Sequence, residues 1–391
     1  MKTTFATILA NDNKTSVEAS KLSDGKLWIK ESELKASTGY ELKSSGICYP
    51  ELDICIPAHQ QGWTQSIDNE KWINVSAISQ YLGQACVNNK DKSIWSLGIL
   101  PERRSKMLES NLAPDFSMLD IHGETVTLSK LKGKKVLIVT WATWCGCRFD
   151  LKSWQKIYEE LNDPNFEIIC VAQDSQGEEV ARKWFVDAKA TFKCIVDPSH
   201  KISSLFGWVN VPTGAWIDEN GKIVRVNEAA YAQEHEIKNL VSTTKFGSNA
   251  FGDATKKWVK FGLTDDIKQS QEKLSLNTRM QNAEDFKALA HFKLGLHLLQ
   301  IGHKQEAEQH FDAARKLAPD NWNIQRQSWT FKGTLHAIKS WNRITRANAE
   351  SDQKWTYYQP MDLANASTRR TTRIEFIWEK WADKCKNLFK S

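Results

Sequence analysis

The sequence has no apolar run long enough to cross a membrane. A transmembrane helix needs about 20 consecutive apolar residues, and no such stretch occurs among the 391 residues of the chain. Near the N-terminus only residues 5–10 are apolar, which is too short for the hydrophobic segment of a secretory signal. We therefore expect a cytoplasmic protein with no membrane span.

The sequence is also poor in basic tracts and in cysteine. The net charge of +6 is spread along the chain, whereas nucleic-acid-binding proteins concentrate lysine and arginine, so we expect no nucleic-acid partner. Eight cysteines in 391 residues are too few for a disulfide scaffold.

Four residues in the N-terminal part could bind a metal by their type: Cys48, Cys55, His59 and Cys86. Their spacing lacks the close Cys-x-x-Cys doublets of a zinc site, so we expect no metal and no other cofactor. Cys48 and Cys55 could be a redox-linked disulfide or ordinary thiols.

The chain does contain enough apolar sequence for two or three domains. Its apolar share of 41% and charged share of 26% are ordinary for a globular protein. The 17 tryptophans are scattered along the chain rather than clustered, which favours a role in packing over a single aromatic binding surface.

The most informative stretch is residues 136–148, where two cysteines follow a predicted strand. Residues 136–140 form a β-branched apolar run of the kind found in strands buried on both faces. Cys145 and Cys147 follow, and apolar residues at spacings of three and four predict a helix over 149–161. A thiol at a helix N-terminus faces unpaired N–H groups, which favour the thiolate, the form that attacks disulfides.

The residues around this stretch resemble a known family. Trp141-Ala-Thr-Trp144-Cys145 resembles the active-site segment of the TlpA/ResA-like branch of the thioredoxin superfamily, whose domains are also called redoxin or AhpC/TSA-like. Upstream, residues 113–116 (Ala-Pro-Asp-Phe) resemble the opening of these domains, and Val211-Pro212-Thr213 resembles their cis-proline loop. The resemblance covers residues 112–227. It implies an α/β thioredoxin fold, thiol-disulfide chemistry and a cis peptide bond before Pro212.

One departure from the family bears on the chemistry. The usual pair is Cys-x-x-Cys, but here only Gly146 separates Cys145 from Cys147. Residues two apart on a helix project to nearly opposite sides, so a disulfide between them needs a non-helical turn, which Gly146 permits. Such a bond is expected to be comparatively oxidising. Three interpretations stay open: Cys145 attacks and Cys147 resolves, Cys145 acts alone, or both cysteines are structural.

Four further residues are candidates for substrate binding: Trp144, Arg148, Val211 and Pro212. Arg148 could lower the thiol pKa or hold an anionic substrate, or it could be a solvated residue of the first helical turn. Pro212 has no N–H and would leave a neighbouring backbone edge free for an extended substrate. Asp174 could tune the site or bind substrate, although we favour a solvated loop carboxylate. Cys170 and Cys194 are expected in the core.

The sequence divides into five segments: an N-terminal tail (1–21), a small α+β domain (22–100), a charged linker (101–111), the thioredoxin-like redoxin domain (112–228) and a C-terminal α-helical region (229–391). Within the helical region, residues 288–321 resemble one tetratricopeptide (TPR) repeat. One repeat cannot bury its own face, so we expect it to stack on helices predicted at 234–241, 254–261 and 322–340. Residues 374–389 carry an apolar stripe at helical spacing and are expected to dock on the body of the protein.

The leading functional hypothesis is thiol-disulfide exchange at a Cys-Gly-Cys site, with Cys145 attacking and Cys147 resolving. One alternative is a peroxiredoxin-like thiol peroxidase with Cys145 as the peroxidatic residue, although the Pro-x-x-x-Thr-x-x-Cys motif of peroxiredoxins is absent. Another is a protein-interaction scaffold with a non-catalytic redoxin fold. The expected partners are thiol or disulfide proteins, an external thiol reductant and a protein bound by the TPR-like region. Many TlpA-like proteins work outside the cytoplasm, so a periplasmic location is the alternative to a cytoplasmic one.

Overall fold

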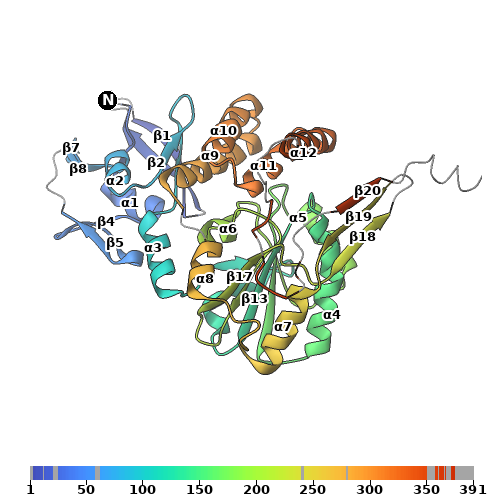
Figure 1. The fold of residues 1–391 in the computed structure, drawn as a ribbon. Helices are drawn as coiled ribbons and strands as arrows, with labels where there is room; N and C mark the ends of the chain where they lie inside the picture. The colour runs from blue at the N-terminus through green and yellow to red at the C-terminus, as the bar shows by residue number, and fades with distance from the viewer. Residues whose placement is uncertain are drawn as a thin grey trace, which may run out of the picture. The chain divides into compact units, whose positions relative to one another are not determined.

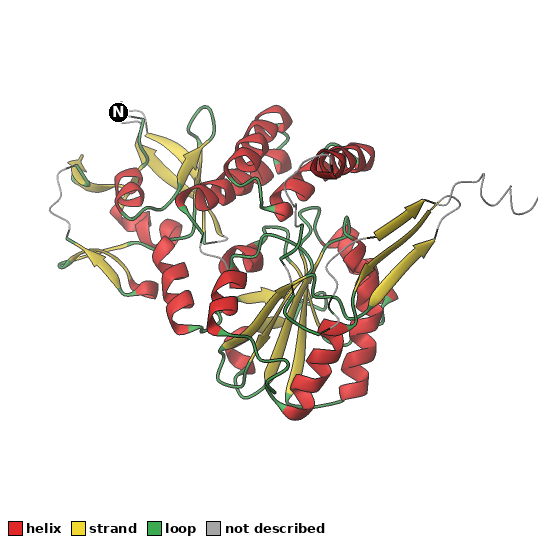
Figure 2. Cartoon of the chain, viewed as in Figure 1, coloured by secondary structure: helices red, strands yellow, loops and turns green. Residues whose placement is uncertain are grey.

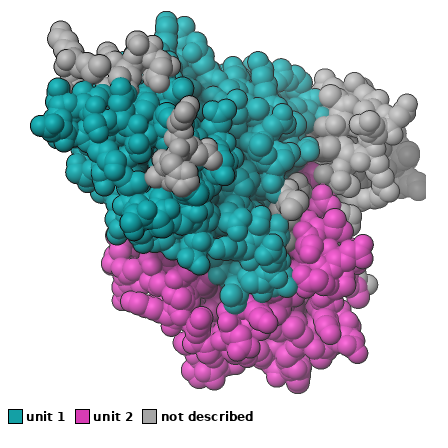
Figure 3. All heavy atoms as spheres, turned by 90° about the vertical axis from the view of Figure 1, so that its left-hand side faces the viewer, with its two compact units in different colours: residues 1–114, 197–209, 278–344 teal, residues 115–196, 210–277, 345–391 magenta. Residues whose placement is uncertain are grey.

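The computed structural model describes most of the chain. The described residues are 3–11, 13–20, 25–57, 62–238, 242–278, 281–349, 357–359, 361–364, 366 and 371–374. Two compact units, coloured separately in Figure 3, make up the protein: unit 1 comprises residues 1–114, 197–209 and 278–344, and unit 2 comprises residues 115–196, 210–277 and 345–391. Each unit is therefore assembled from three separate segments of the chain.

Unit 2 is built on a five-stranded sheet with the order β15-β14-β13-β16-β17. Its strands are β13 (Lys135–Trp141), β14 (Phe166–Ala172), β15 (Lys193–Val196), β16 (Thr213–Ile217) and β17 (Ile223–Glu228). The central strand β13 pairs in parallel with β14 and antiparallel with β16. Because β13 and β14 are buried on both faces, they consist of apolar, largely β-branched residues. The sequence predicted β13 to within one residue at each end.

Helices α4 (Leu151–Leu161), α5 (Glu178–Asp187) and α7 (Ala250–Phe261) bury aromatic side chains against this sheet. Trp216 of β16 stacks on Trp258 of α7 with 4.9 Å between ring centroids. Trp141 of β13 meets Phe185 of α5 edge to face at 5.1 Å. Figure 1 shows α4 and α7 side by side on the sheet. This sheet with its covering helices is the thioredoxin fold that the resemblance implied.

The other elements of unit 2 are β11 (Ser117–Leu119), β12 (Thr125–Thr127), η2 (Leu128–Leu131), η3 (Gly146–Asp150), β18 (Glu234–Lys238), β19 (Ser242–Gly247), α8 (Gln271–Thr278) and β20 (Thr371–Ile374). Strands β18, β19 and β20 form a separate antiparallel sheet, whose strand β20, red in Figure 1, comes from the far C-terminal part of the chain. The helix predicted at 234–241 is wrong, because residues 234–238 pair as β18 with a strand rich in threonine, a residue that favours sheets.

Unit 1 contains a seven-stranded sheet with the order β7-β8-β3-β2-β1-β10-β9, in which only β1 and β10 pair in parallel, and a three-stranded sheet β4-β5-β6. The larger sheet consists of β1 (Thr3–Ala10), β2 (Asn13–Ser20), β3 (Trp28–Lys30), β7 (Thr64–Ile67), β8 (Glu70–Asn74), β9 (Cys86–Asn88) and β10 (Ile94–Leu97). The smaller sheet consists of β4 (Glu41–Lys43), β5 (Gly46–Tyr49) and β6 (Ile54–Ile56), with η1 (Pro50–Leu52) between the last two. The helices that begin in unit 1 are α1 (Glu31–Thr38), α2 (Val75–Tyr81), α3 (Pro101–Ser110), α6 (Lys201–Phe206), α9 (Ala283–Gln300), α10 (Lys304–Leu317), α11 (Trp322–Thr330) and α12 (Thr334–Ala349). Figure 2 distinguishes these helices and strands by colour.

Two of the predicted segments in unit 1 are corrected by the structure. Residues 3–10 and 13–20 are not a tail, because they form the paired strands β1 and β2. Alternate residues of β1 such as Ile8 are buried, as a strand with one face on the core requires. Residues 101–110 are not a linker, because they form α3, which buries Arg104 and Met107 one helical turn apart.

Helices α9 and α10 pack closely through small residues. A Cβ added to Gly295 would lie 2.7 Å from Cε1 of Phe311, so the contact requires glycine. The apolar face of α9 packs in one cluster with Val87 of β9 and Ile94 of β10. A sheet of unit 1 packs on this face. The expected stacking on a helix at 234–241 is wrong, because residues 234–238 form a strand, while the stacking on 254–261 stays a prediction. The TPR character of residues 288–321 stays a prediction.

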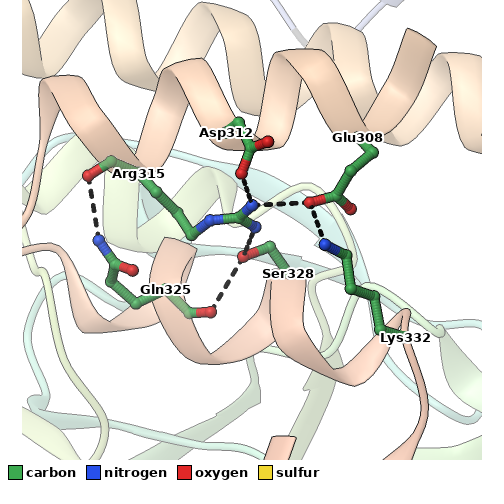
Figure 4. A network of polar contacts seen from close by, with 6 residues as sticks. All are labelled: Glu308, Asp312, Arg315, Gln325, Ser328 and Lys332. Carbon is green, nitrogen blue, oxygen red and sulfur yellow. Dashed lines mark hydrogen bonds and ion pairs between the residues drawn. The ribbon is translucent and has the colours of Figure 1, made fainter. Parts of the chain in front are cut away.

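A network of polar contacts fastens α10 to the segment that follows it, and Figure 4 shows its members: Glu308, Asp312, Arg315, Gln325, Ser328 and Lys332. The guanidinium of Arg315 donates to Oγ of Ser328 at 2.8 Å and to Oε1 of Glu308 at 2.7 Å. Nζ of Lys332 lies 2.7 Å from the same oxygen of Glu308. Arg315 thus links two successive helices through one planar group with several donors.

No helix in the described part of the chain is both long and apolar enough to cross a bilayer. The cytoplasmic location expected from the sequence stays a prediction. The apolar stripe at 374–389 lies outside the described residues, apart from residue 374 at the end of β20.

Candidate active site

Cys145 lies in the turn that follows the central strand β13. The strand ends at Trp141, and the backbone N–H of Cys145 donates to the carbonyl of Ala142 at 3.0 Å, which closes the turn. Cys145 is the N-cap of the 3-10 helix η3, which leads directly into α4. The predicted helix therefore begins earlier than residue 149, as a 3-10 turn, and Cys145 stands at its N-terminus as expected.

Cys145 and Cys147 are thiols in this structure and lie close together. The backbone N–H of Cys147 points at Sγ of Cys145, with 3.5 Å between nitrogen and sulfur. A backbone donor stabilises negative charge on a sulfur, so this geometry favours the thiolate of Cys145. Each cysteine is only 2% exposed, so both sulfurs are shielded from bulk water.

The proline loop predicted from the resemblance lies against Cys145. The Val211–Pro212 peptide bond is cis, as predicted. The thiol of Cys145 donates to the carbonyl of Val211, with 3.7 Å between sulfur and oxygen. Oγ1 of Thr140 holds the loop to β13, since it donates to the carbonyl of Thr213 at 3.1 Å and accepts from its N–H at 2.9 Å. The structure thus brings together two predicted site segments that are 66 residues apart in sequence.

A hairpin absent from the sequence prediction covers the cysteine turn. Phe246 of β19 packs on Gly146, because a Cβ added to Gly146 would lie 3.0 Å from Cε2 of Phe246. Gly146 does not have a positive φ in this structure. The freedom expected of it concerns a Cys145–Cys147 disulfide and stays a prediction, because both cysteines are thiols here. Phe246 also stacks on His235 of β18 with 5.4 Å between ring centroids. The β-branched and aromatic residues of 242–246 were the available sequence signal for this strand.

Asp150, at the end of η3, ties the same hairpin to the cysteine turn. Its carboxylate accepts from the backbone N–H of Ala232 at 2.5 Å, and its other oxygen lies 2.8 Å from Nε2 of His235. Burial raises the pKa of Asp150, and the contact with His235 opposes that rise. The turn that carries both cysteines is therefore fixed to the element that covers it.

Two tyrosine hydroxyls lie beside the thiols. Tyr358 donates to the carbonyl of Val211 at 3.0 Å, and the hydroxyl oxygens of Tyr231 and Tyr358 are 3.4 Å apart. Burial, followed by charge on Cys145 and Cys147, raises the pKa of Tyr231 well above its usual value. Burial, followed by charge on Tyr231 and Cys145, does the same to the pKa of Tyr358. Neither tyrosine was a candidate, because a single tyrosine in a loop carries no motif or periodic signal.

Arg148 faces the backbone of the cysteine turn. Its guanidinium donates to the carbonyl of Thr143 at 3.1 Å and to the carbonyl of Cys145 at 2.8 Å. It also lies over the rings of Phe149 and Trp184, at 4.4 and 5.1 Å from their centroids. These contacts hold the turn in shape, so the solvated reading of Arg148 is wrong, while its substrate-binding role stays a prediction.

Two more residues named from the sequence are placed near this turn. Trp144 is half-buried against the core cluster that contains both cysteines. Asp174 is fully buried, so the expectation of a solvated loop carboxylate is wrong. The loop after β14 thus contributes to the packing around the site, as its position at the end of a parallel strand suggested.

The other cysteines are not part of this centre. Cys170 and Cys194 lie opposite each other in β14 and β15 and are buried, as expected of core residues. Burial raises the pKa of Cys170 well above its usual value and that of Cys194 to about 12. In unit 1, Cys48 and Cys55 form a disulfide across β5 and β6. Within the described ranges, no group of three or more histidine, cysteine or acidic residues could hold a metal ion.

Residues 110–226 match the AhpC/TSA family. The thiol-disulfide oxidoreductase ResA of Bacillus thuringiensis (strain Al Hakam) is 32% identical over 123 residues, which are 31% of this chain and 70% of the relative. The protein of the same name from Bacillus cereus (strain ZK / E33L) is 34% identical over 125 residues, again 31% of this chain and 70% of the relative. Among solved structures, a putative thiol:disulfide interchange protein DsbE from Chlorobium tepidum is 30% identical, with a TM-score of 0.28, and the match covers 30% of this chain and 82% of that one.

Proposed function

Since the chain belongs to the ResA family of thiol-disulfide oxidoreductases, we propose that Cys145 and Cys147 are its redox centre, with Cys145 as the nucleophile and Cys147 as the resolving thiol. The protein is an oxidoreductase that acts on thiols and disulfides. The proposal is the assignment of the two redox-active cysteines. It is needed because this chain has a Cys-Gly-Cys pair where the family has Cys-x-x-Cys.

The reaction has two exchange steps. The thiolate of Cys145 attacks one sulfur of a substrate disulfide, so that a Cys145–substrate disulfide forms and the other substrate sulfur leaves as a thiolate. The thiolate of Cys147 then attacks Sγ of Cys145, which forms the Cys145–Cys147 disulfide and releases the second substrate thiol. Two electrons pass from the protein to the substrate, and an external dithiol restores the reduced protein by the same steps in reverse.

The observation that carries the proposal is the contact between the backbone N–H of Cys147 and Sγ of Cys145 at 3.5 Å. It supports Cys145 as the nucleophile because the donor stabilises the attacking thiolate. The turn itself supports the pairing, since only Gly146 separates the two cysteines and both are buried in the same core cluster.

Peptide mass mapping of the reduced protein after incubation with oxidised glutathione tests the assignment, since Cys48 and Cys55 can also form a disulfide. We expect the wild type to lose two hydrogens through the Cys145–Cys147 bond. We expect Cys147→Ser to retain one glutathione on Cys145, and Cys145→Ser to show neither product at this site. Cys86→Ser is the matched control, because it removes a half-buried thiol of unit 1 whose pKa burial raises to about 12.

Two other outcomes identify the alternatives. If peroxide converts Cys145 to a sulfenic acid much faster than it oxidises free cysteine, the protein is a thiol peroxidase. If neither cysteine reacts with glutathione or peroxide while the protein retains its cellular role, the redoxin fold is an interaction scaffold. In that case a partner of the TPR-like region, which stays a prediction, becomes the next question.

A further inference from the structure

A short C-terminal segment lies on the proline loop of unit 2. We call residues 357–359, 361–364 and 366 the C-terminal strap. Tyr358 donates its hydroxyl hydrogen to the carbonyl of Val211 at 3.0 Å, although 147 residues separate the two. The side-chain amide of Asn210 donates to the carbonyl of Tyr357 at 2.8 Å. Both contacts join the strap to the loop that lies beside Cys145.

Further contacts anchor the strap outside the loop. The guanidinium of Arg225, which is fully buried, forms an ion pair with Asp362. The backbone N–H of Gln359 donates to Oε2 of Glu228 at 3.0 Å. Leu363 is buried in the core cluster of unit 2. A buried ion pair is costly to separate once its charges are desolvated, so the strap is a fixed part of the site.

The strap uses the backbone group that an extended substrate would need. A polypeptide binds at a backbone edge by exchanging main-chain hydrogen bonds with it. Here the N–H of Val211 donates to Oδ1 of Asn210 at 2.9 Å. Its carbonyl accepts from Cys145 at 3.7 Å and from Tyr358 at 3.0 Å. The edge that we expected to be free beside Pro212 is therefore occupied.

We propose that the C-terminal strap determines the substrate class of the Cys145 site, because Tyr358 holds the Val211 carbonyl that an extended polypeptide disulfide needs. With the strap in place, Cys145 exchanges faster with small disulfides than with polypeptide disulfides that must pair with the loop. The inference rests on the proposed function, since it assumes that Cys145 is the attacking thiol. A small disulfide needs only the sulfur, whereas a polypeptide also needs the main chain of the loop.

The ratio of two rates tests this proposal: kcat/KM for insulin, a polypeptide disulfide, divided by kcat/KM for oxidised glutathione. We expect Tyr358→Phe to raise this ratio about fivefold, which corresponds to the roughly 1 kcal/mol of one net hydrogen bond. Phe retains the ring and removes only the hydroxyl. We expect Asp362→Ala, which releases the anchor on Arg225, to raise the ratio at least as much.

Gln359→Ala is the matched control within the strap. Its contact with Glu228 uses the backbone N–H, which the substitution retains, so we expect the ratio to stay at the wild-type value. A measurement on the wild type alone does not depend on the folding of a variant. We compare the alkylation rate of Cys145 by iodoacetamide, a small reagent, with its rate by a maleimide attached to a long polymer. The ratio of the first rate to the second should be far larger for Cys145 than for free cysteine.

The two proposals fail in different ways. If Cys145 forms no mixed disulfide with glutathione in any variant, the proposed function is wrong. If exchange with glutathione proceeds while Tyr358→Phe and Asp362→Ala leave the insulin-to-glutathione ratio unchanged, the strap does not determine the substrate class. Equal alkylation of the wild type by the small and the large reagent leads to the same conclusion.

Discussion

Thr143 and Asp174 are joined by two hydrogen bonds to a single carboxylate oxygen. The backbone N–H of Thr143 donates to Oδ2 of Asp174 at 2.8 Å, and the hydroxyl of Thr143 donates to the same oxygen. Thr143 lies two residues before Cys145, and Asp174 lies two residues after β14. The end of β14 thereby positions the turn that carries the thiols.

Replacing Asp174 should distinguish its hydrogen bonds from its charge. Asp174→Leu leaves a buried N–H of Thr143 without a partner, so we expect a loss of about 1–3 kcal/mol in the free energy of unfolding. Asp174→Asn retains an acceptor oxygen for Thr143, so its free energy of unfolding should fall less. Burial raises the pKa of Asp174, so removing the charge also relieves a desolvation cost. Urea unfolding measures both losses. Equal losses of unfolding free energy in the two variants would show that stability depends on the charge of Asp174 and not on its acceptor oxygen.

Gly146→Ala should destabilise the protein through the contact with Phe246. The added methyl group would lie 3.0 Å from Cε2 of Phe246, and overpacking of this kind costs about 1–3 kcal/mol. Phe246→Leu removes that contact. Unfolding of both single variants and the double variant in urea should therefore give a double-variant loss smaller than the sum. Strict additivity would contradict the contact as the cause.

Stability should fall as the pH drops from about 6.5 towards 4. Nδ1 of His291 lies 2.8 Å from Nδ1 of His310. Burial, followed by charge on His310 and Lys287, lowers the pKa of His291 to about 4. An unfolded histidine titrates near pH 6.5, so between these values the unfolded chain binds a proton that the folded one does not. His200, whose pKa burial lowers to about 3, acts in the same direction.

Thermal unfolding at pH 7.5, 6.0 and 4.5 measures this dependence. We expect His291→Gln to reduce the fall in Tm by about 2–4 °C, the shift that roughly 1 kcal/mol produces in a domain of this size. His303→Gln is the control, because His303 is exposed at the start of α10. If Tm of His291→Gln falls with pH as steeply as that of the wild type, His291 is not a source of the pH dependence.

Arg315→Lys should weaken the packing of α10 on α11. Lysine cannot donate to Ser328 and Glu308 at once from a planar fork, so we expect a loss of about 1–2 kcal/mol. Lys332→Met removes a more exposed ion pair to the same Glu308 and should cost less than about 1 kcal/mol. Guanidinium titrations of the two variants give the comparison. A larger loss of unfolding free energy in Lys332→Met than in Arg315→Lys would mean that the Lys332–Glu308 ion pair contributes most of the network's stability.

The sequence allowed the redoxin sheet and the two thiols to be predicted because their signals are local. A parallel strand buried on both faces must be apolar along its length, so β13 and β14 are evident as continuous runs. The proline loop was found from its resemblance to the family, and the structure brings Val211 within 3.7 Å of Cys145.

The covering elements could not be predicted because their signals are tertiary. Asp174 is buried because Thr143 offers it two donors, and nothing in its neighbouring residues indicates this. Gly146 reads as a flexible residue until Phe246 is known to pack on it. Tyr358 belongs to a stretch without periodicity, and only its partner across 147 residues explains its position. Strand β1 was missed because exposed Phe5 obscured the alternation of its buried residues.

The distance along the chain between Val211 and Tyr358 also orders events in time. A ribosome adds about 5–20 residues per second, so the 147 intervening residues take roughly 7–30 s to synthesise. Throughout that interval the nascent chain already contains both cysteines and the proline loop but lacks Tyr358. Under the proposal for the strap, the nascent protein is a less selective thiol reagent than the folded one until Tyr358 has been made.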